Sequence, residues 1–406
     1  MQLPAELAGG RARRALVLMG LALVALAAAA GFYLHGAGSR PAPQQVPSVT
    51  SLDWLSPTVG WVVLTDRQSR SVLFHTVDGG QHWERQFATI GSAISVRFLD
   101  GRRGLMTEPT PFPGANPTVL RSDDGGDHWA PIELPFGIGP RPTLPFFLDL
   151  DHGWVMVRTG RSDSVEDADI YRTDDGGLDW TLVASVDPVS WTSHGLREEG
   201  LKRWIWFQTP RDGWLGSLEQ DGSASVYVTH DGGGQWRWVP LPEPPGGWSP
   251  GDTLTLQPPR ISATGDGALL LVAATRLVPP PGDRPAEPRA QAPVVVYRTL
   301  DGGETWRDPV AAPAGADPRR TDPAFVDGAA GWLTTGGAAW VTSDSGRTWD
   351  RRGRLPSGRS FAELAAVDDQ VAVGQSAAGT AAGSAWSLVV TEDAGRTWRD
   401  LSPPQL

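Results

Sequence analysis

Seven aspartates in this sequence recur inside one short motif, Ser/Thr-x-Asp-x-Gly-x-x-Trp. The first copy has Thr76, Asp78, Gly80 and Trp83 at its four fixed positions, and every later copy keeps the same spacing. Repeated carboxylates could act as acid and base groups in hydrolysis or as oxygen ligands for calcium. The aspartates are Asp78, Asp124, Asp175, Asp231, Asp301, Asp344 and Asp393, and the tryptophans that close the copies are Trp83, Trp129, Trp180, Trp236, Trp306, Trp349 and Trp398.

The motif also has a structural explanation that covers all seven copies. A Ser/Thr hydroxyl and a carboxylate two residues apart can both accept hydrogen bonds from the backbone N–H groups of a tight turn. Glycine at the fifth position suits a positive φ, and the tryptophan three residues later can pack back against a sheet. We therefore expect each copy to be a hairpin between two strands, with no catalytic aspartate and no bound metal.

Other ionisable groups give little support for a metal or cofactor site. Carboxylate pairs such as Glu198 with Glu199 could serve a glycosidase, but the sequence does not pair carboxylates across repeats. The acidic run 163–169 lacks the glycine and terminal glutamate of an EF-hand loop, so a solvated loop is favoured over a calcium site. The seven histidines form no His-x-x-x-His pair, and cysteine is absent. We expect no metal and no cofactor.

A second repeated element lies between the motifs and indicates which strands position them. It is Gly-Trp or Gly-apolar followed by a short apolar run, as at Gly60-Trp61 and Gly153-Trp154, and its tryptophans are expected in the core. Each unit then predicts four strands, and a four-stranded unit of about 40 to 50 residues is the period of a propeller blade. The sequence predicts an all-β, seven-bladed β-propeller of four-stranded blades over residues 48–403, with the first strand (48–55) and the last (398–402) as neighbours.

The composition agrees with a turn-rich all-β protein and disfavours nucleic acid as a partner. The chain has 406 residues, with 49 Gly, 36 Pro and 19 Trp, which suits tight turns and aromatic strands. Its formal net charge is −11 and Lys202 is its single lysine, so no broad basic surface exists to hold a phosphate backbone.

The N-terminal segment predicts a membrane anchor. Arg11, Arg13 and Arg14 precede an uncharged apolar run at 15–34, and twenty helical residues span roughly 30 Å, the thickness of a bilayer core. We expect residues 1–14 in the cytoplasm, a single transmembrane helix over 15–34, a linker over 35–47 and the propeller on the extracytoplasmic side of the cell membrane. The small residues at 27–30 leave a cleaved signal peptide as the alternative.

The seven motifs and the Gly-Trp strands, after an export segment, resemble the BNR/Asp-box propellers, and most closely the photosystem II assembly factors of the Ycf48 type. The motif is therefore called the Asp-box. The resemblance implies a non-catalytic propeller that docks a membrane-protein client or an assembly partner. Sialidases, sortilin-type receptors and xyloglucan-active hydrolases also carry Asp-boxes, so the boxes specify the fold better than the activity.

The tyrosines argue against sialidase chemistry, which uses a tyrosine nucleophile. Tyr171, Tyr227 and Tyr297 each stand two residues before an Asp-box Thr, and Tyr33 ends the apolar run. Equivalent positions in a repeat indicate structural roles, so we expect no enzyme. A glycan-binding or glycoside-hydrolase propeller is the alternative, and a purely structural envelope module without a specific partner is a third hypothesis.

Long segments outside the repeat mark where a binding surface is expected. The Asp-box and Gly-Trp turns should share one face of the ring, called here the box face. The segments 107–118, 158–169, 186–203, 242–259 and 277–293 should then gather on the opposite face, the crown face. Tryptophan and arginine are enriched at interface hot spots. The predicted contacts to a protein client, a membrane complex or a glycan are Trp191, His194, Arg197, Lys202, Arg203 and Trp248.

Overall fold

A computed structural model describes residues 47–90, 94–108, 118–134, 141–142, 145–158, 168–186, 194–244, 247, 252–261, 268–276, 294–313, 324–326, 329–335, 337–355, 359–378 and 386–406. The chain divides into two compact units, residues 1–45 and 46–406, and all described residues belong to the second. The predicted anchor at 15–34 lies outside them, as does the linker apart from Pro47. Within the described ranges, no helix is long and apolar enough to cross a membrane.

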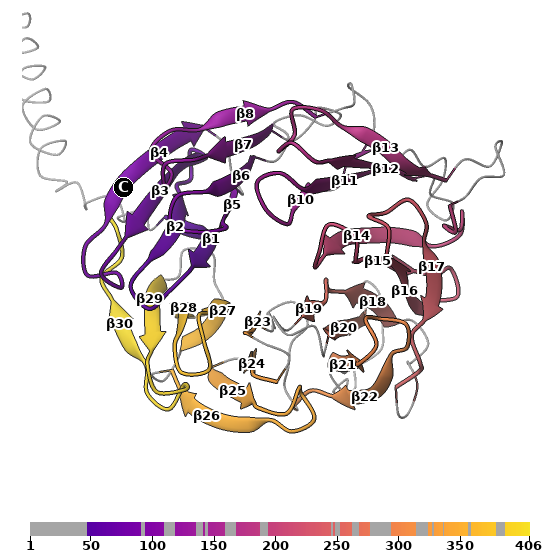
Figure 1. Ribbon diagram of the computed structural model, residues 1–406. Coiled ribbons are helices and arrows are strands. Elements are labelled where there is room, and N and C mark those ends of the chain that lie inside the picture. The colour runs from indigo at the N-terminus through magenta and orange to yellow at the C-terminus, as the bar shows by residue number, and fades with distance from the viewer. Residues whose placement is uncertain are drawn as a thin grey trace, which may run out of the picture. The chain divides into compact units, whose positions relative to one another are not determined.

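The described residues form seven antiparallel sheets, each made of strands that are consecutive in the sequence and ordered from the centre of the ring outward (Figure 1). The first and second sheets contain β1 (Ser48–Trp54), β2 (Gly60–Thr65), β3 (Arg70–Thr76), β4 (Glu84–Ile90), β5 (Ser95–Phe98), β6 (Gly104–Glu108), β7 (Thr118–Ser122) and β8 (Ala130–Ile132). The third and fourth contain β9 (Arg141–Pro142), β10 (Phe146–Phe147), β11 (Gly153–Arg158), β12 (Ala168–Thr173), β13 (Thr181–Ser185), β14 (Leu201–Phe207), β15 (Gly213–Leu218), β16 (Ala224–Thr229) and β17 (Arg237–Pro240).

The last three sheets repeat the plan, and the short strands β9 and β19 are the extra members that make two sheets five-stranded. These sheets contain β18 (Asp252–Leu256), β19 (Arg260–Ile261), β20 (Ala268–Arg276), β21 (Val294–Thr299), β22 (Arg307–Ala311), β23 (Ala324–Phe325), β24 (Gly331–Thr335), β25 (Ala338–Thr342), β26 (Asp350–Arg354), β27 (Arg359–Ala366), β28 (Ala372–Ala378), β29 (Trp386–Thr391) and β30 (Arg399–Leu401).

The Asp-box turn and the Gly-Trp turn of a sheet lie side by side. In the first sheet the backbone N–H of Gly79 donates to the carbonyl of Thr58 at 2.9 Å. Five other sheets have the equivalent bond: Gly125 to Arg102, Gly176 to Asp151, Gly232 to Arg211, Ser345 to Ala329 and Ala394 to Gln370. Both kinds of turn therefore share the box face, as expected from the repeat.

Aromatic rings explain why glycine precedes the tryptophan of the Gly-Trp turn. A Cβ on Gly60 would lie 2.2 Å from the Trp54 ring, and one on Gly213 would lie 2.4 Å from Phe207. In the first four sheets, an aromatic ring from the strand before the turn therefore packs against this glycine. At Phe207 the preceding sheet continues the stack, because Trp154 on β11 lies parallel to Phe207 with ring centroids 3.6 Å apart.

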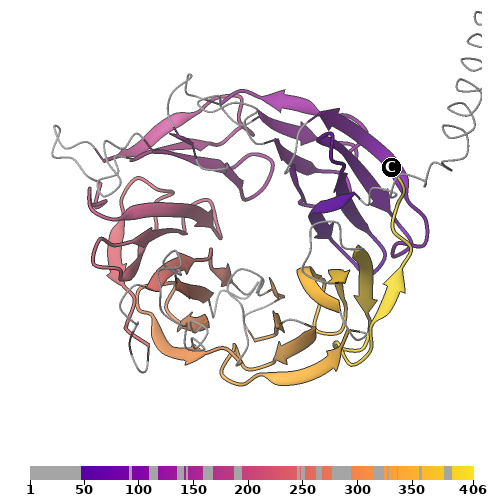
Figure 2. The same cartoon turned by 180° about the vertical axis from the view of Figure 1, so that it is seen from behind.

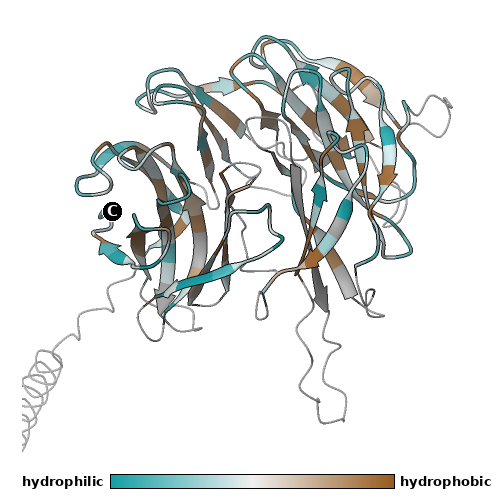
Figure 3. Cartoon of the chain, turned by 60° about the horizontal axis from the view of Figure 1, so that its bottom comes forward, coloured by the Kyte–Doolittle hydropathy of each residue, from teal (hydrophilic) through white to brown (hydrophobic). Residues whose placement is uncertain are grey.

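Neighbouring sheets are joined by buried clusters and by indole hydrogen bonds. Trp61, Trp154, Trp214 and Trp332 are at most 1% exposed. Trp154 Nε1 donates to the carbonyl of Gly232 at 2.9 Å, and Trp214 Nε1 donates to Gly302 at 3.0 Å, so each indole reaches the Asp-box of the following sheet. Figure 3 shows apolar segments along the strands, while many of the turns are hydrophilic.

The seventh sheet closes against the first. One buried cluster contains Leu52 and Phe74 from the first sheet with Val373 and Leu401 from the seventh. Trp83 Nε1 donates to the carbonyl of Ser402 at 2.9 Å. β1 and β30 therefore lie in adjacent sheets and not in one, and the sheets follow one another around a centre (Figures 1 and 2). This arrangement is that of an all-β propeller.

Candidate functional site

The Asp-box carboxylates are engaged by their own turns. Asp78 Oδ1 accepts the backbone N–H groups of Gln81 and His82, both at 2.9 Å, and the hydroxyl of Thr76 at 2.9 Å. The hydrogen bond from the backbone N–H of His82 is the main cause that lowers the pKa of Asp78 to about 2. Each box repeats the bond from its Ser/Thr hydroxyl to its Asp, at 2.7 to 2.9 Å. These bonds suit a turn, and the pKa of each Asp-box aspartate is lowered, so these seven carboxylates are held in the charged form.

Two tyrosine hydroxyls are likewise engaged. Tyr227 Oη accepts the backbone N–H of Arg197 at 3.4 Å, and burial raises the pKa of Tyr227 to about 12. Tyr297 Oη donates to the carbonyl of Pro242 at 2.8 Å, and burial raises the pKa of Tyr297 as well. A raised pKa disfavours a tyrosine as a nucleophile, and both hydroxyls are bonded to backbone groups.

Of the six predicted contact residues, Trp191 and Trp248 lie outside the described residues. His194 lies against the Asp-box turn of the fourth sheet, where its Nδ1 is 2.9 Å from the carbonyl oxygen of Gly234. The backbone carbonyl of His194 accepts the N–H of Trp236 at 2.8 Å. His194 is therefore held at the box face, although the prediction placed it with the crown loops.

Residues 194–200, which we call the strap, run along the seam between the third and fourth sheets. Leu196 is buried in the cluster that joins these two sheets. At the other end of the strap, a Cβ on Gly200 would lie 2.5 Å from Ser217 Oγ and 2.5 Å from Glu219 Oε2. Glu219 begins the β15–β16 turn, so the strap passes from the box face towards the crown face.

Lys202 is buried and is not a surface contact. Its side chain is 0% exposed, and its Nζ donates to the carbonyls of Glu199 at 2.9 Å, of Gly200 at 3.1 Å, and of Arg197. An ammonium group has three hydrogens to donate, so this lysine fits a cage of three strap carbonyls. Lys202 stabilises the strap, which corrects the predicted role in partner contact.

Arg197 is exposed midway along the strap and stacks on a tryptophan that sequence reasoning did not single out. Its Cζ lies 3.7 Å from the centroid of the Trp238 ring. Trp238 Nε1 donates to Glu219 Oε1 at 3.5 Å. Arg203 is also exposed, on β14. The available signal was a second tryptophan two residues after the Asp-box Trp236, a position at which the other boxes have none.

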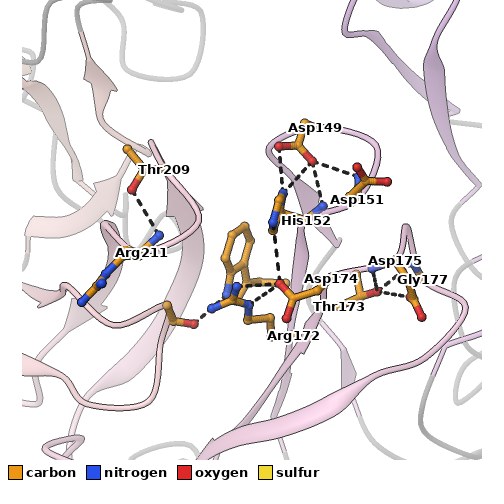
Figure 4. Close-up of polar contacts among 12 residues, drawn as sticks. Asp149, Asp151, His152, Arg172, Thr173, Asp174, Asp175, Gly177, Thr209 and Arg211 are labelled. Atoms are coloured by element: carbon orange, nitrogen blue, oxygen red, sulfur yellow. Dashed lines mark hydrogen bonds and ion pairs between the residues drawn. The ribbon is translucent and has the colours of Figure 1, made fainter.

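A separate charged network lies on the box face of the third sheet (Figure 4). His152 Nδ1 is 2.9 Å from Asp149 Oδ2, and His152 Nε2 is 3.8 Å from Asp174 Oδ1. Arg172 Nε donates to Asp174 Oδ1 at 2.8 Å, and the Arg172 guanidinium lies 5.6 Å from the centroid of the Trp154 ring. These bonds tie the Gly-Trp turn to the Asp-box beside it.

The fourth sheet has a similar network, in which the aspartate lies in the Gly-Trp turn and the histidine lies in the Asp-box. His230 follows the Asp-box threonine, and its two ring nitrogens each lie 2.9 Å from a carboxylate oxygen, of Asp212 and of Glu304. The hydrogen bonds with Glu304 and then Asp212 raise the pKa of His230. Arg237 also pairs with Glu304, so the network links the fourth sheet to the fifth. In the described part of the sequence, no group of three or more metal-ligating side chains is arranged to hold an ion.

Comparison with known proteins identifies the fold. No protein-family model matches the sequence. No curated protein matches it either. The solved structure "YCF48 from Cyanidioschyzon merolae" has a TM-score of 0.50 and 18% identity, covering 86% of this chain and 97% of that one. The chain has a Ycf48-like β-propeller fold.

Two further solved structures are similar. "YCF48 bound to D1 peptide" has a TM-score of 0.49 and 18% identity, covering 82% of this chain and 91% of that chain. A polysaccharide lyase of family PL25, an ulvan lyase, has a TM-score of 0.51 and 12% identity, covering 85% of this chain and 92% of the lyase. At 12% identity the likeness to the lyase shows the fold and not the activity.

Proposed function

We propose that the protein is a non-catalytic scaffold on the extracytoplasmic side of the cell membrane, a seven-bladed propeller anchored through residues 15–34 that binds a protein client. The observation that carries the proposal is the exposed Arg197 stacked 3.7 Å above Trp238 on a strap packed into the propeller. Arginine and tryptophan dominate protein-binding hot spots, and a fixed strap limits the ordering cost of binding.

A non-catalytic role is supported by how the reactive groups are used. The Asp-box carboxylates accept hydrogen bonds within their own turns, and the hydroxyls of Tyr227 and Tyr297 bond to strap and loop backbone. Burial raises the pKa of both tyrosines, which opposes nucleophilic chemistry. The aspartates and tyrosines considered for hydrolase chemistry thus make structural hydrogen bonds, which supports a non-catalytic role.

Affinity capture from detergent-solubilised membranes of the native organism tests the proposal. The full-length protein with a C-terminal tag is compared with a variant in which Trp191, Arg197, Arg203 and Trp248 are all changed to alanine. We expect one membrane protein or complex to be enriched by the parent and lost with the variant. The scaffold proposal fails if the parent enriches nothing beyond an unrelated tagged protein, and the site assignment fails if the variant captures equally.

A second candidate function, glycan binding, is favoured by an aromatic row on the inner strands. Phe146 on β10 and Trp206 on β14 are partly exposed, with ring centroids 5.6 Å apart. The Arg97 guanidinium lies 5.5 Å from the centroid of the Phe146 ring. Partly exposed rings of this kind can stack on sugars. A glycan array probed with the parent and with Trp206→Ala tests it, because a sugar signal that the variant loses would place glycan binding ahead of protein binding.

A further inference from the structure

The Arg197 side chain is held against an aromatic face and forms no ion pair with a described carboxylate. Its Cζ lies 3.7 Å from the Trp238 ring centroid, which is stacking distance for a planar guanidinium. Stacking uses the flat face of the group and leaves its N–H edge for hydrogen bonds. Because Arg197 is exposed, that edge is accessible from solvent.

Two other arginines beside Asp-boxes form ion pairs. Arg121 pairs with Asp123 at 3.2 Å, and Arg172 pairs with Asp174. The side chains of these two arginines are 27% and 20% exposed, against 62% and 61% for their aspartates. Arg197 differs from both, because its guanidinium is exposed and an indole takes the place of the carboxylate.

The acid beside Trp238 is also engaged. Glu219 Oε1 accepts the hydroxyl of Ser225 and the indole N–H of Trp238, the latter at 3.5 Å. These bonds fix the indole that supports Arg197. Glu219 therefore helps to orient the platform.

The backbone that carries Arg197 is fixed from three directions. Lys202 Nζ donates to the carbonyl of Arg197 itself, and Tyr227 Oη accepts its N–H at 3.4 Å. Two residues earlier, Gly195 has φ of 81° and passes so close to Trp236 that a Cβ there would lie 1.7 Å from its carbonyl oxygen. The guanidinium is thus presented by a segment that has already lost much of its freedom, which lowers the cost of binding.

We propose that Arg197, supported by Trp238, binds a carboxylate group of the protein partner through paired N–H···O bonds. A guanidinium matches a carboxylate in a bidentate geometry, and such charge-assisted bonds are roughly twice as strong as neutral ones. This inference rests on the proposed function and names the chemistry that the partner presents at this site. The carboxylate belongs either to the partner's C-terminus or to one of its acidic side groups.

Indole NMR of the full-length protein tests this directly. The Trp238 Nε1–H signal is assigned by its loss in Trp238→Phe, and the signals of the other 18 tryptophans report whether each variant is folded. The probes are N-acetyl-triglycine, its C-terminal amide, N-acetyl-Asp-Glu-Asp amide and inorganic phosphate. The first and third probes separate a C-terminal from a side-chain carboxylate.

The Trp238 signal should shift saturably with at least one carboxylate peptide and not with N-acetyl-triglycine amide. Arg197→Gln should abolish the shift, and Arg197→Lys should weaken binding at least about tenfold because lysine keeps the charge but loses the planar fork. Arg85→Gln, at an exposed arginine on β4, is the matched control and should bind like the parent.

The proposal is overturned if no probe shifts the signal, if the amide shifts it as much as the acid, if Arg197→Gln still binds, or if phosphate binds more tightly than both carboxylate peptides. Membrane capture separates this inference from the proposed function. A client retained by Arg197→Gln would reject the carboxylate contact and leave the scaffold standing. Carboxylate binding without any captured client would reject the scaffold alone.

Discussion

The side-chain hydrogen bonds of an Asp-box join residues only a few positions apart. The positions with the least space for a larger side chain lie elsewhere, where an aromatic ring packs against a glycine. Thr76 and Asp78 bond groups between residues 76 and 82. Gly213, by contrast, is required by Phe207, which follows from the pairing of β14 with β15. Single-residue effects should therefore be largest where an aromatic ring is locked between two sheets.

Gly213→Ala tests that expectation. A Cβ would lie 2.4 Å from Phe207, and Phe207 is held by its stack on Trp154, so neither ring can yield easily. We expect a loss of about 1 to 3 kcal/mol in the free energy of unfolding, measured by urea denaturation. Gly101→Ala is the control, because a Cβ there meets nothing within 4 Å and should change stability by less than about 0.5 kcal/mol.

Asp53 on β1 should make stability depend on pH. Burial raises the pKa of Asp53 from 3.8 to about 6, while its Oδ2 accepts the N–H of Phe98. The folded state then binds the proton more tightly than the unfolded state, so this group lowers stability as the pH rises from 3.8 through 6. Asp53→Asn keeps an oxygen acceptor without the charge.

The Asp53→Asn variant should be more stable than the parent at pH 7.5, by up to about 3 kcal/mol, and the gain should shrink towards zero near pH 4. Urea unfolding of both proteins at the two pH values measures the difference. A gain of equal size at both pH values would show that the charge of Asp53 is not responsible.

At the scale of elements, the strap shows how a connection outside the repeat becomes part of the scaffold. Its buried Leu196 packs between the third and fourth sheets, and the Lys202 ammonium fills its carbonyl cage. The same connection exposes Arg197. Leu196 and Lys202 therefore anchor the segment, while Arg197 between them faces solvent.

Lys202→Met should release the strap while keeping the length of the side chain. Three carbonyls would lose their donor, and we expect a loss of about 2 kcal/mol in stability with faster amide exchange at residues 195–200. Hydrogen exchange with mass spectrometry measures this. Arg203→Met, at the adjacent exposed position, is the control and should leave exchange in the strap unchanged.

At the scale of the whole molecule, the ring closes through side-chain contacts and not through a shared sheet. The first sheet takes all its strands from the start of the described residues, and the seventh takes all of its strands from the end. Leu401 and the carbonyl of Ser402 contact the first sheet, as do Val373 on β28 and Leu388 on β29. The closing seam therefore involves several strands of the seventh sheet, and Leu401 is one part of it.

Leu401→Ala should weaken that seam. Leu401 is 4% exposed, and its loss would leave a cavity between the first and seventh sheets, costing about 2 to 4 kcal/mol. Leu406→Ala is the matched control, since Leu406 is 51% exposed and should change stability by less than about 0.5 kcal/mol. Thermal unfolding of both variants provides the measurement, and equal midpoints would contradict closure through Leu401.

The sequence by itself determined the Asp-box turns, the repeat and the β-propeller fold. These features are local or periodic: each box bonds within a few residues, and each unit must bury its apolar strands against a neighbour. The shared box face followed from strand order alone. The membrane anchor, its orientation and the contacts of Trp191 and Trp248 stay predictions.

Only the tertiary structure decided what the strap residues do. The sequence placed His194, Arg197, Lys202 and Arg203 in one basic and aromatic segment, but it could not show that Lys202 points inward or that Arg197 meets Trp238. The carbonyls that Lys202 contacts are local, but Trp238 is far from Arg197 in the sequence. Tyr227 and Gln235 are likewise 30 and 41 positions from the strap residues that they contact. These distant contacts depend on how one sheet packs against the next, and no local pattern encodes that packing.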